Sequence, residues 1–470
     1  MNPDRGSEDL VFNGVDLDTG EYLTPPLPLC ELAENIRADQ PGGAHADELR
    51  RRRQDDEAHY GIMYGRDPED IGQAAWGLVI PRDLDQAVLE ALGPLVSIRR
   101  EQAGNLYQQL TVEPGETKTD FLSRHGMGPS QADPRKVPYY LLIVGSPDQI
   151  PFSFQYQLDV SYAVGRLDFA TPDEYASYAQ AAAAAESAAP PPPTEQRVHL
   201  FGVRNPGDTP TALSASRLVQ PLADDLLGWK RWQVTADIGE PATRQRLYDL
   251  LTGPDAPGVL FTASHGVCTS GDQQREVQGA LLCQDWPGPL KRAGRIGDGQ
   301  YLAGRDIPAD QPVKPRVIFA FACYGGGTPA IADFADTAAA PRPNLADRDF
   351  VARLPQRLLG NPAGGALAFI GHVDRAWSCS FLWRGTDAQI TAFSSTLRAL
   401  LDGKRLGNAM EAMNSRYAEV STELTSSIDA YRRSGKVIDD HELVGLWTAN
   451  NDARSYIVLG DPAVRLTAAP

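Results

Sequence analysis

Short apolar runs recur along most of the chain, and stretches with helical periodicity lie between them. The first run, WGLVIP, begins at Trp76, and the segment DLDQAVLEAL follows it. In that segment Leu84, Val88 and Leu92 recur at helical spacing. Asp83 precedes them as the expected N-cap. Later runs of the same kind are YYLLIVG, RVHLFGV, WQVTADI, GVLFTAS, RVIFAFA and GGALAFIG. Buried strands that alternate with helices are typical of a largely parallel sheet, so the pattern predicts an α/β protein.

Changes in composition divide the chain into four parts. Residues 1–70 show no sustained strand pattern and are predicted to be an N-terminal extension. Residues 71–187 form the first predicted α/β sub-domain, which ends in the stretch AAAAAESAAPPPP. Residues 188–194 are predicted to be a semi-rigid linker, because proline-rich segments adopt extended conformations. Residues 195–470 form the second sub-domain, where the alternation of strands and helices is most regular.

The charge balance argues against a nucleic-acid partner. The chain of 470 residues carries 61 acidic and 44 basic side chains, whereas a phosphate-binding surface needs a local excess of Lys and Arg. No apolar run is long enough to span a membrane, and the charged start MNPDRGSEDL lacks the apolar core of a signal peptide. The expected location is therefore the cytoplasm, with no membrane partner.

Two predicted strands end on residues that can carry chemistry. Cys323 follows RVIFAFA and is separated by Tyr324 from three glycines, and His265 follows GVLFTAS. Because the carboxyl ends of parallel strands meet at one edge of a sheet, we expect the thiol and the imidazole to lie close together. A cysteine nucleophile needs a neighbouring imidazole, and its tetrahedral intermediate needs N–H donors. The backbone amides of Gly266 and Cys323 are the natural donors.

Simpler interpretations compete with this one. A lone buried cysteine is usually a small core residue, and a lone histidine is often structural. The joint pattern, with both residues at strand ends, favours a catalytic dyad. A structural zinc site needs four ligands in paired short spacings, and His265, Cys268 and Cys283 lack a fourth. The segment YGGGTP also lacks the Lys-Ser/Thr of a phosphate-binding loop, so we expect no metal and no nucleotide cofactor.

The order of these motifs resembles that of the caspase-like (clan CD) cysteine peptidases. The segments RVHLFGV, WQVTADI, TRQRLYDLL and FTASHG follow the order of a caspase domain up to its catalytic histidine. The whole chain looks most like the gingipain type, through YYLLIVGSPDQIPF and YAVGRLDFATPDEYASYA in the first half and YIVLGDPAVRL near residue 460. The resemblance implies a caspase-like α/β/α sandwich with two sub-domains. It also implies that His265 and Cys323 are the dyad, and that the amides of Gly266 and Cys323 form the oxyanion hole.

The residues that select the substrate are less clear. Caspases have Gln two positions before the nucleophile and metacaspases have Asp, whereas this chain has Phe321, so the motif supplies no acidic pocket. Trp377, in GHVDRAWSCSFLW, is a candidate for an aromatic wall beside the substrate. Asp374 and Asp208 are candidates for a negative charge facing a basic side chain. Each of the two also has a simpler interpretation as a turn residue.

The segment AIADFADTAAAPRPNLADRDF after the nucleophile is small and polar, which predicts a mobile loop. By analogy with the caspase activation linker, we expect self-cleavage there, at Arg342, Arg348 or an adjacent aspartate. The predicted function is an intracellular cysteine endopeptidase that acts on protein or peptide substrates and is controlled by an activating partner. Two alternatives are a catalytically silent interaction module with the same fold, and an acyltransferase or deamidase that uses the same dyad.

Overall fold

The structure is a computed structural model, and it describes most of the chain. The described residues are 9–10, 14–23, 27–28, 61–187, 196–229, 231–289, 294–332, 344–383, 388–434 and 439–466. The predicted linker, residues 188–194, lies outside them, and so does Arg342 of the predicted cleavage loop.

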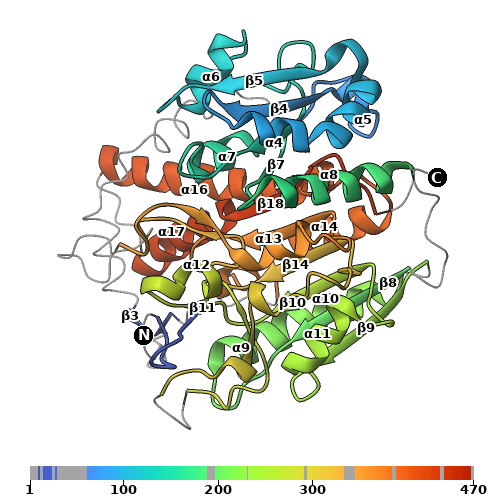
Figure 1. Ribbon diagram of the computed structural model, residues 1–470. Helices are drawn as coiled ribbons and strands as arrows, with labels where there is room; N and C mark the ends of the chain where they lie inside the picture. The colour runs from blue at the N-terminus through green and yellow to red at the C-terminus, as the bar shows by residue number, and fades with distance from the viewer. Residues whose placement is uncertain are drawn as a thin grey trace.

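A single ten-stranded sheet runs through the molecule (Figure 1). Neighbouring strands are parallel along the whole sheet, except that β17 and β18 are antiparallel. The predicted α/β fold with a mainly parallel sheet is therefore confirmed. In spatial order the strands are β5 (Gln108–Val112), β4 (Trp76–Pro81), β6 (Tyr140–Val144), β7 (Ala163–Leu167), β18 (Tyr456–Gly460), β17 (Ala368–His372), β14 (Val317–Phe321), β10 (Val259–Ala263), β8 (Arg197–Gly202) and β9 (Gln233–Ile238).

The central strands are apolar because helices and loops cover both of their faces. Every residue of β4, β6, β7, β18, β17, β14 and β10 is buried. The edge strands differ, since β5 and β9 keep exposed or half-buried positions. A strand buried on both faces shows no alternation of polar and apolar residues, which explains the continuous apolar runs in the sequence.

Helices connect the strands, and side-chain caps fix where several of them begin. The helices are α3 (Ile71–Ala74), α4 (Gln86–Ala91), α5 (Gly93–Ala103), α6 (Lys118–Arg124), α7 (Phe152–Leu158), α8 (Pro172–Ser187), α9 (Thr209–Ser214), α10 (Gln220–Leu226), α11 (Arg244–Thr252), α12 (Gln274–Val277), α13 (Arg353–Leu359), α14 (Thr391–Leu401), α15 (Leu406–Ala409), α16 (Glu411–Ser434) and α17 (Asp440–Arg454). Thr243 caps α11, as its position after a proline suggests. The predicted cap Asp83 is wrong, because Asp85 accepts the hydrogen bond from the Ala87 N–H and α4 begins at Gln86.

The C-terminal strand joins the two halves of the sheet. Residues 71–187 supply β4 to β7, and the later part of the chain supplies the other strands. β18 lies between the halves, parallel to β7 and antiparallel to β17 (Figure 1). The two predicted sub-domains therefore share one hydrogen-bonded sheet.

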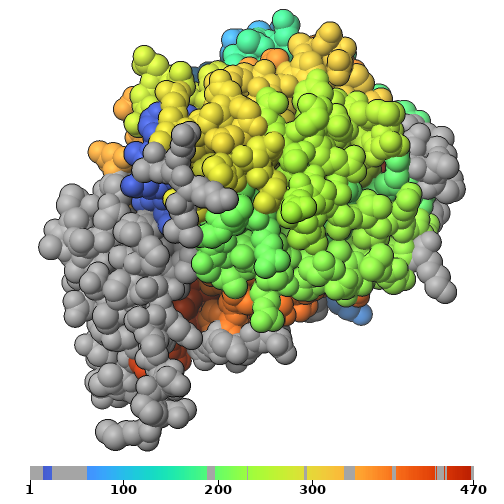
Figure 2. All heavy atoms as spheres, turned by 90° about the horizontal axis from the view of Figure 1, so that it is seen from below, coloured from blue at the N-terminus to red at the C-terminus, as the bar shows by residue number. Residues whose placement is uncertain are grey.

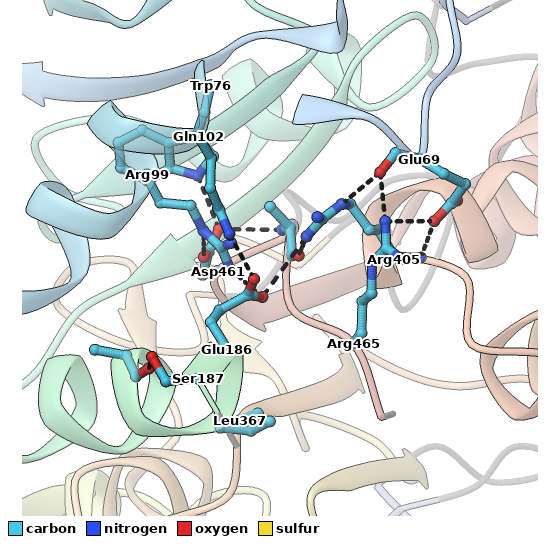
Figure 3. Close-up of polar contacts among 12 residues, drawn as sticks. Glu69, Trp76, Arg99, Gln102, Glu186, Ser187, Leu367, Arg405, Asp461 and Arg465 are labelled. Carbon is cyan, nitrogen blue, oxygen red and sulfur yellow. Dashed lines mark hydrogen bonds and ion pairs between the residues drawn. The ribbon is translucent and has the colours of Figure 1, made fainter. Parts of the chain in front are cut away.

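A buried charged cluster fixes the end of β18 against the first half (Figure 3). Asp461 accepts hydrogen bonds from Trp76 Nε1 at 2.9 Å and from Arg99 Nε at 2.7 Å. Arg99 also contacts Glu186 at 2.9 Å, at the end of α8. Both Arg99 and Asp461 are fully buried, and an ion pair of this kind is costly to break because one charge would be left without a partner.

Four two-stranded sheets complete the described structure. They pair β1 (Asp9–Leu10) with β3 (Leu27–Pro28), β2 (Val15–Asp16) with β11 (Val267–Cys268), β12 (Leu281–Leu282) with β13 (Tyr301–Leu302), and β15 (Gly327–Thr328) with β16 (Phe350–Val351). Among the helices in the described ranges, none is both long and apolar enough to cross a membrane.

Candidate active site

Two neighbouring parallel strands bring the predicted dyad to one edge of the sheet. β10 and β14 pair in register, with Ala263 opposite Phe321, so His265 and Cys323 each follow their strand by two residues. Gly266 packs directly against Cys323, because a Cβ atom at Gly266 would lie 1.7 Å from the carbonyl oxygen of Cys323. Only glycine allows so close an approach of two backbones. The predicted oxyanion-hole residues, Gly266 and Cys323, thus lie side by side.

A buried carboxylate orients His265. The Nε2 atom of His265 lies 2.9 Å from Oδ2 of Asp208, and both side chains are fully buried. Asp208 follows β8 and caps α9, where it accepts a hydrogen bond from the Thr211 backbone N–H at 3.2 Å. It also accepts hydrogen bonds from the Thr211 hydroxyl and, at 2.6 Å, from the Tyr22 hydroxyl. Because Asp208 caps α9, its carboxylate is held in place, and its contact with Nε2 holds the imidazole of His265 in turn.

The same contacts set the protonation of Asp208. Burial acts to raise the pKa of Asp208, but the interaction with His265 and the hydrogen bonds from His265, Thr211 and Tyr22 outweigh it, so the pKa lies below its usual value. The pKa of Tyr22 is raised, first by burial and then by the charge of Asp208. Asp208 is therefore the ionised partner and Tyr22 the neutral donor.

The thiol of Cys323 is fully buried and is held by backbone. The Ala376 N–H donates to Sγ at 3.2 Å. Burial raises the pKa of the Cys323 thiol well above its ordinary value, and the Ala376 hydrogen bond opposes that shift only in part. In the closed site the group is therefore a neutral thiol, and it becomes a better nucleophile when the site opens to water.

Two residues beside the thiol have left-handed backbone conformations. In the described part of the chain, positive φ angles at non-glycine residues occur at Ala75, Tyr324 (57°) and Asp374 (67°). Tyr324 follows the nucleophile directly, and its N–H donates to the carbonyl of Asp374 at 2.7 Å. Such conformations are uncommon for side chains of this size and gather at functional sites.

A short N-terminal hairpin, residues 14–23, lies in the site. The Gly14 N–H donates to Nδ1 of His265 at 2.7 Å. A Cβ atom at Gly14 would lie 3.2 Å from Sγ of Cys323 and 2.9 Å from Cδ1 of Leu23. Gly14, with a φ of +111°, therefore lies close to both His265 and Cys323.

The N-terminal hairpin is anchored to the part of the chain that follows His265. β2 pairs in parallel with β11, which follows His265, and Leu17 donates its N–H to the Cys268 carbonyl at 2.8 Å. Val15 and Leu17 are fully buried in an apolar cluster with residues such as Trp286. Figure 2 shows the hairpin in blue beside the yellow segment, where Ile296 donates to the Leu17 carbonyl. Burial of two such side chains stabilises the docked hairpin by about 1.5–3 kcal/mol each.

The chain is similar to known proteins in structure, but no similarity in sequence was found. No family model matches the chain, and no curated protein matches its sequence. Among solved structures, the Arg-specific cysteine proteinase gingipain R (RgpB) is similar with a TM-score of 0.51 at 12% identity, over 88% of this chain and 81% of that chain. The chain has a caspase-like fold of the gingipain type. A complex of the Porphyromonas gingivalis RgpB pro- and mature domains gives a TM-score of 0.47 at 11% identity, covering 84% and 81% of the two chains. A structure described as a protease gives 0.45 at 13%, covering 83% and 78%.

All of the residues predicted to select the substrate are buried. Phe321 is fully buried, and its ring centroid lies 5.6 Å from that of Phe381 in the aromatic core. Trp377 packs into a second apolar cluster formed largely by α16 and α17. Asp374 is buried and accepts a hydrogen bond from the Arg375 N–H at 2.7 Å. Asp208 lies against His265, as described above. The roles of these four residues in substrate selection stay predictions.

Of the two arginines predicted as cleavage positions, Arg348 lies within the described residues. Its guanidinium is 59% exposed and lies 3.9 Å from the half-exposed carboxylate of Asp148. Cleavage at Arg348 stays a prediction.

Two parts of this site leave little signal in the sequence. The hairpin strand β2 has only two residues, and its sole trace is the alternation VDLD at residues 15–18. Asp208 was recognisable as a turn residue, but its contact with His265 joins positions far apart in the sequence. A two-residue strand and a long-range carboxylate–imidazole pair leave no periodic pattern.

Proposed function

We propose that this chain is a cysteine endopeptidase, with Cys323 as nucleophile and His265 as general acid and base. The observation that carries the proposal is that one backbone residue reaches both groups: the Gly14 N–H donates to Nδ1 of His265 at 2.7 Å, and a Cβ atom at Gly14 would lie 3.2 Å from Sγ of Cys323. Peptide hydrolysis requires that a peptide backbone can reach the thiol and the imidazole together. An activating partner and a cytoplasmic location, both expected from the sequence, stay predictions.

The proposed reaction uses groups of this chain. His265 Nδ1 takes the proton of the Cys323 thiol, and the sulfur attacks the carbonyl carbon of the scissile bond. The N–H groups of Gly266 and Cys323 stabilise the oxyanion. Nδ1 then donates the proton to the leaving amine, and a thioester remains on Cys323. Water, deprotonated by His265, hydrolyses the thioester. Asp208 stabilises the transient imidazolium through Nε2.

The test is a panel of fluorogenic peptides with varied residues before the cleaved bond. It is run on the wild-type chain, on Gly14→Ala, in which the new Cβ atom meets Leu23 and the thiol and so opens the site, and on Cys323→Ala. Turnover that is lost in Cys323→Ala supports the peptidase. Cys379→Ala is the matched control, because this half-buried thiol lies in the second apolar cluster, and its removal should leave turnover unchanged.

The panel also separates the peptidase from the silent module. If neither the wild type nor Gly14→Ala turns over any peptide, and iodoacetamide labels Cys323 in neither, the peptidase proposal fails and the interaction module is favoured. Transfer of the acyl group to added amines without peptide hydrolysis would instead identify the acyltransferase.

Replacement of Asp208 should lower kcat with little change in KM, because Asp208 acts on the substrate only through His265. We expect Asp208→Asn to reduce kcat by about 10- to 100-fold, since general acid–base catalysis as a whole contributes about 10²- to 10⁴-fold. Asparagine also caps helices well, so the start of α9 should be preserved. Steady-state kinetics of the Gly14→Ala chain with and without Asp208→Asn measures the effect.

A purely structural role of Asp208 would give a different result. In that case Asp208→Asn would keep its kcat, and Asp208→Ala, which loses the cap, would lose about 1 kcal/mol of stability without any loss of kcat for the folded enzyme. Thermal unfolding of both variants distinguishes the two roles.

A further inference from the structure

The segment that follows β17, residues 373–380, lies against Cys323. The Ala376 N–H donates to Sγ of Cys323 at 3.2 Å, and two residues earlier the Asp374 carbonyl accepts the Tyr324 N–H at 2.7 Å. Burial raises the pKa of the Cys323 thiol, and the Ala376 N–H is the strongest of the groups that act to lower it. The position of Ala376 therefore bears on how readily the thiol ionises.

One buried residue holds this segment at both ends. Asp452, which is fully buried in the last turn of α17, accepts the Trp377 N–H at 3.0 Å on Oδ1 and the Ser380 hydroxyl at 2.5 Å on Oδ2. At the start of the segment, Nε2 of His372 lies 3.5 Å from Oδ1 of Asp452 and 3.1 Å from its backbone carbonyl oxygen. Residues 374–376 lie between these anchors, so their position depends on Asp452.

The surroundings of Asp452 keep its carboxylate ionised. Burial acts to raise the pKa of Asp452, but the hydrogen bonds from His372 and Ser380 and the charge of Arg416 outweigh it, so the pKa lies below its usual value. Arg416 lies in α16 and reaches Oδ2 at 3.4 Å. Two neutral titratable side chains lie nearby, and burial raises the pKa of each: Tyr456 and Cys379. A charged acceptor holds its donors more strongly than a neutral one, so Asp452 is a firm anchor for the segment.

We propose that Asp452 is a positioning residue for the nucleophile, which holds residues 374–376 so that the Ala376 N–H stays on the thiol of Cys323. The inference rests on the proposed peptidase function and explains how that site keeps its nucleophile ready to react. Asp452 acts through the backbone of the segment and carries no proton in the reaction. Without its carboxylate, Trp377 and Ser380 lose their acceptor, and the segment can move away from Sγ.

The pH dependence of thiol labelling tests the proposal. Iodoacetamide is added over a range of pH to the Gly14→Ala chain with and without Asp452→Ala, and peptide mapping by mass spectrometry follows the label on Cys323. Because the thiolate is the reactive form, the midpoint of the profile reports the pKa of the thiol, whereas a change in access alone scales the rate at every pH. We expect Asp452→Ala to raise the midpoint by about one pH unit and to lower kcat/KM for peptides by about 10-fold, the effect of one hydrogen bond to a charged group.

Two further variants in the same Gly14→Ala chain make the test specific. Asp461→Ala is the matched control, because Asp461 is an equally buried carboxylate that lies just beyond the far end of β18, whereas Tyr456 at the near end pairs with His372. Asp461→Ala should lose stability but keep the midpoint of labelling. Ser380→Ala removes one anchor and leaves Asp452 in place, so it should raise the midpoint by a smaller amount. If Asp452→Ala yields no soluble chain, Ser380→Ala decides the test.

The outcomes separate this proposal from the peptidase function. An unchanged midpoint in Asp452→Ala, or in Ser380→Ala where Asp452→Ala does not fold, overturns the positioning role and leaves the peptidase standing if the Gly14→Ala chain hydrolyses peptides. An equal rise in Asp461→Ala also overturns it, because any loss of stability would then have the same effect. A rise specific to Asp452 in a chain that hydrolyses no peptide supports the positioning role, while the peptidase proposal fails. Absence of label on Cys323 at every pH, with and without Asp452→Ala, overturns both.

Discussion

Replacement of His265 by alanine is expected to lower kcat/KM for peptide hydrolysis by about 10²- to 10⁴-fold, the usual contribution of general acid–base catalysis. The ring is fully buried and contacts both Asp208 and Gly14. The measurement is steady-state hydrolysis by the Gly14→Ala chain with and without His265→Ala. Iodoacetamide labelling of Cys323 reports in parallel whether the thiol is still present and accessible.

His199 offers a matched control for this loss. It is also a buried histidine beside a carboxylate, with Nε2 3.1 Å from Asp237, but it lies in β8, in contact with the edge strand β9. His199→Ala removes a comparable buried ring from outside the dyad, so the activity for each folded molecule should be unchanged. An equal loss of activity in the two variants would mean that His265 acts through folding and would contradict its catalytic role.

Replacement of Asp461 by alanine is expected to lower the free energy of unfolding by about 3–5 kcal/mol, because it leaves Arg99 charged and buried without its main partner. The ion pair is 2.7 Å long, and neither side chain is exposed to solvent. Asp461 also accepts the Trp76 indole N–H at 2.9 Å, so the substitution removes a second buried hydrogen bond (Figure 3). Denaturant unfolding followed by tryptophan fluorescence measures the loss.

An exposed pair of the same length provides the control. Arg305 and Asp298 also lie 2.7 Å apart, but their side chains are 36% and 77% exposed. Asp298→Ala should cost less than about 1 kcal/mol, as exposed ion pairs usually do. Similar losses for the two substitutions would show that burial does not decide the strength of the Asp461 pair.

The strands of the central sheet could be predicted from the sequence, because a strand that is buried on both faces forms a continuous apolar run. The segments WGLVIP, YYLLIVG and RVIFAFA coincide closely with β4, β6 and β14. The helix caps were less certain, as Asp83 and Asp85 are both suitable residues and only the backbone geometry selects Asp85. The position of β18 between the two halves cannot follow from local pattern, because it depends on which strands have free edges when the chain has collapsed.

The pairing of His265 and Cys323 could be predicted from the sequence. Each residue follows a strand, and neighbouring parallel strands have their carboxyl ends at the same edge of the sheet. His265 and Cys323 are far apart in sequence but follow neighbouring strands. The contact of Gly14 with this site could not be predicted from the sequence. That Gly14 lies close to both His265 and Cys323 follows from a two-residue strand held by the buried side chains of Val15 and Leu17. Such a contact depends on tertiary packing alone.

The central place of β18 has a consequence for the synthesis of the protein. The ribosome makes residues 456–460 after every other strand of the sheet, yet these residues lie between β7 and β17. Until they emerge, both neighbours keep an unpaired edge, and nascent chains in that state are prone to aggregate. β14, which leads to Cys323, pairs with β17, so it lacks a complete sheet beside it until translation has almost ended. A chain that ends before this strand should therefore be insoluble.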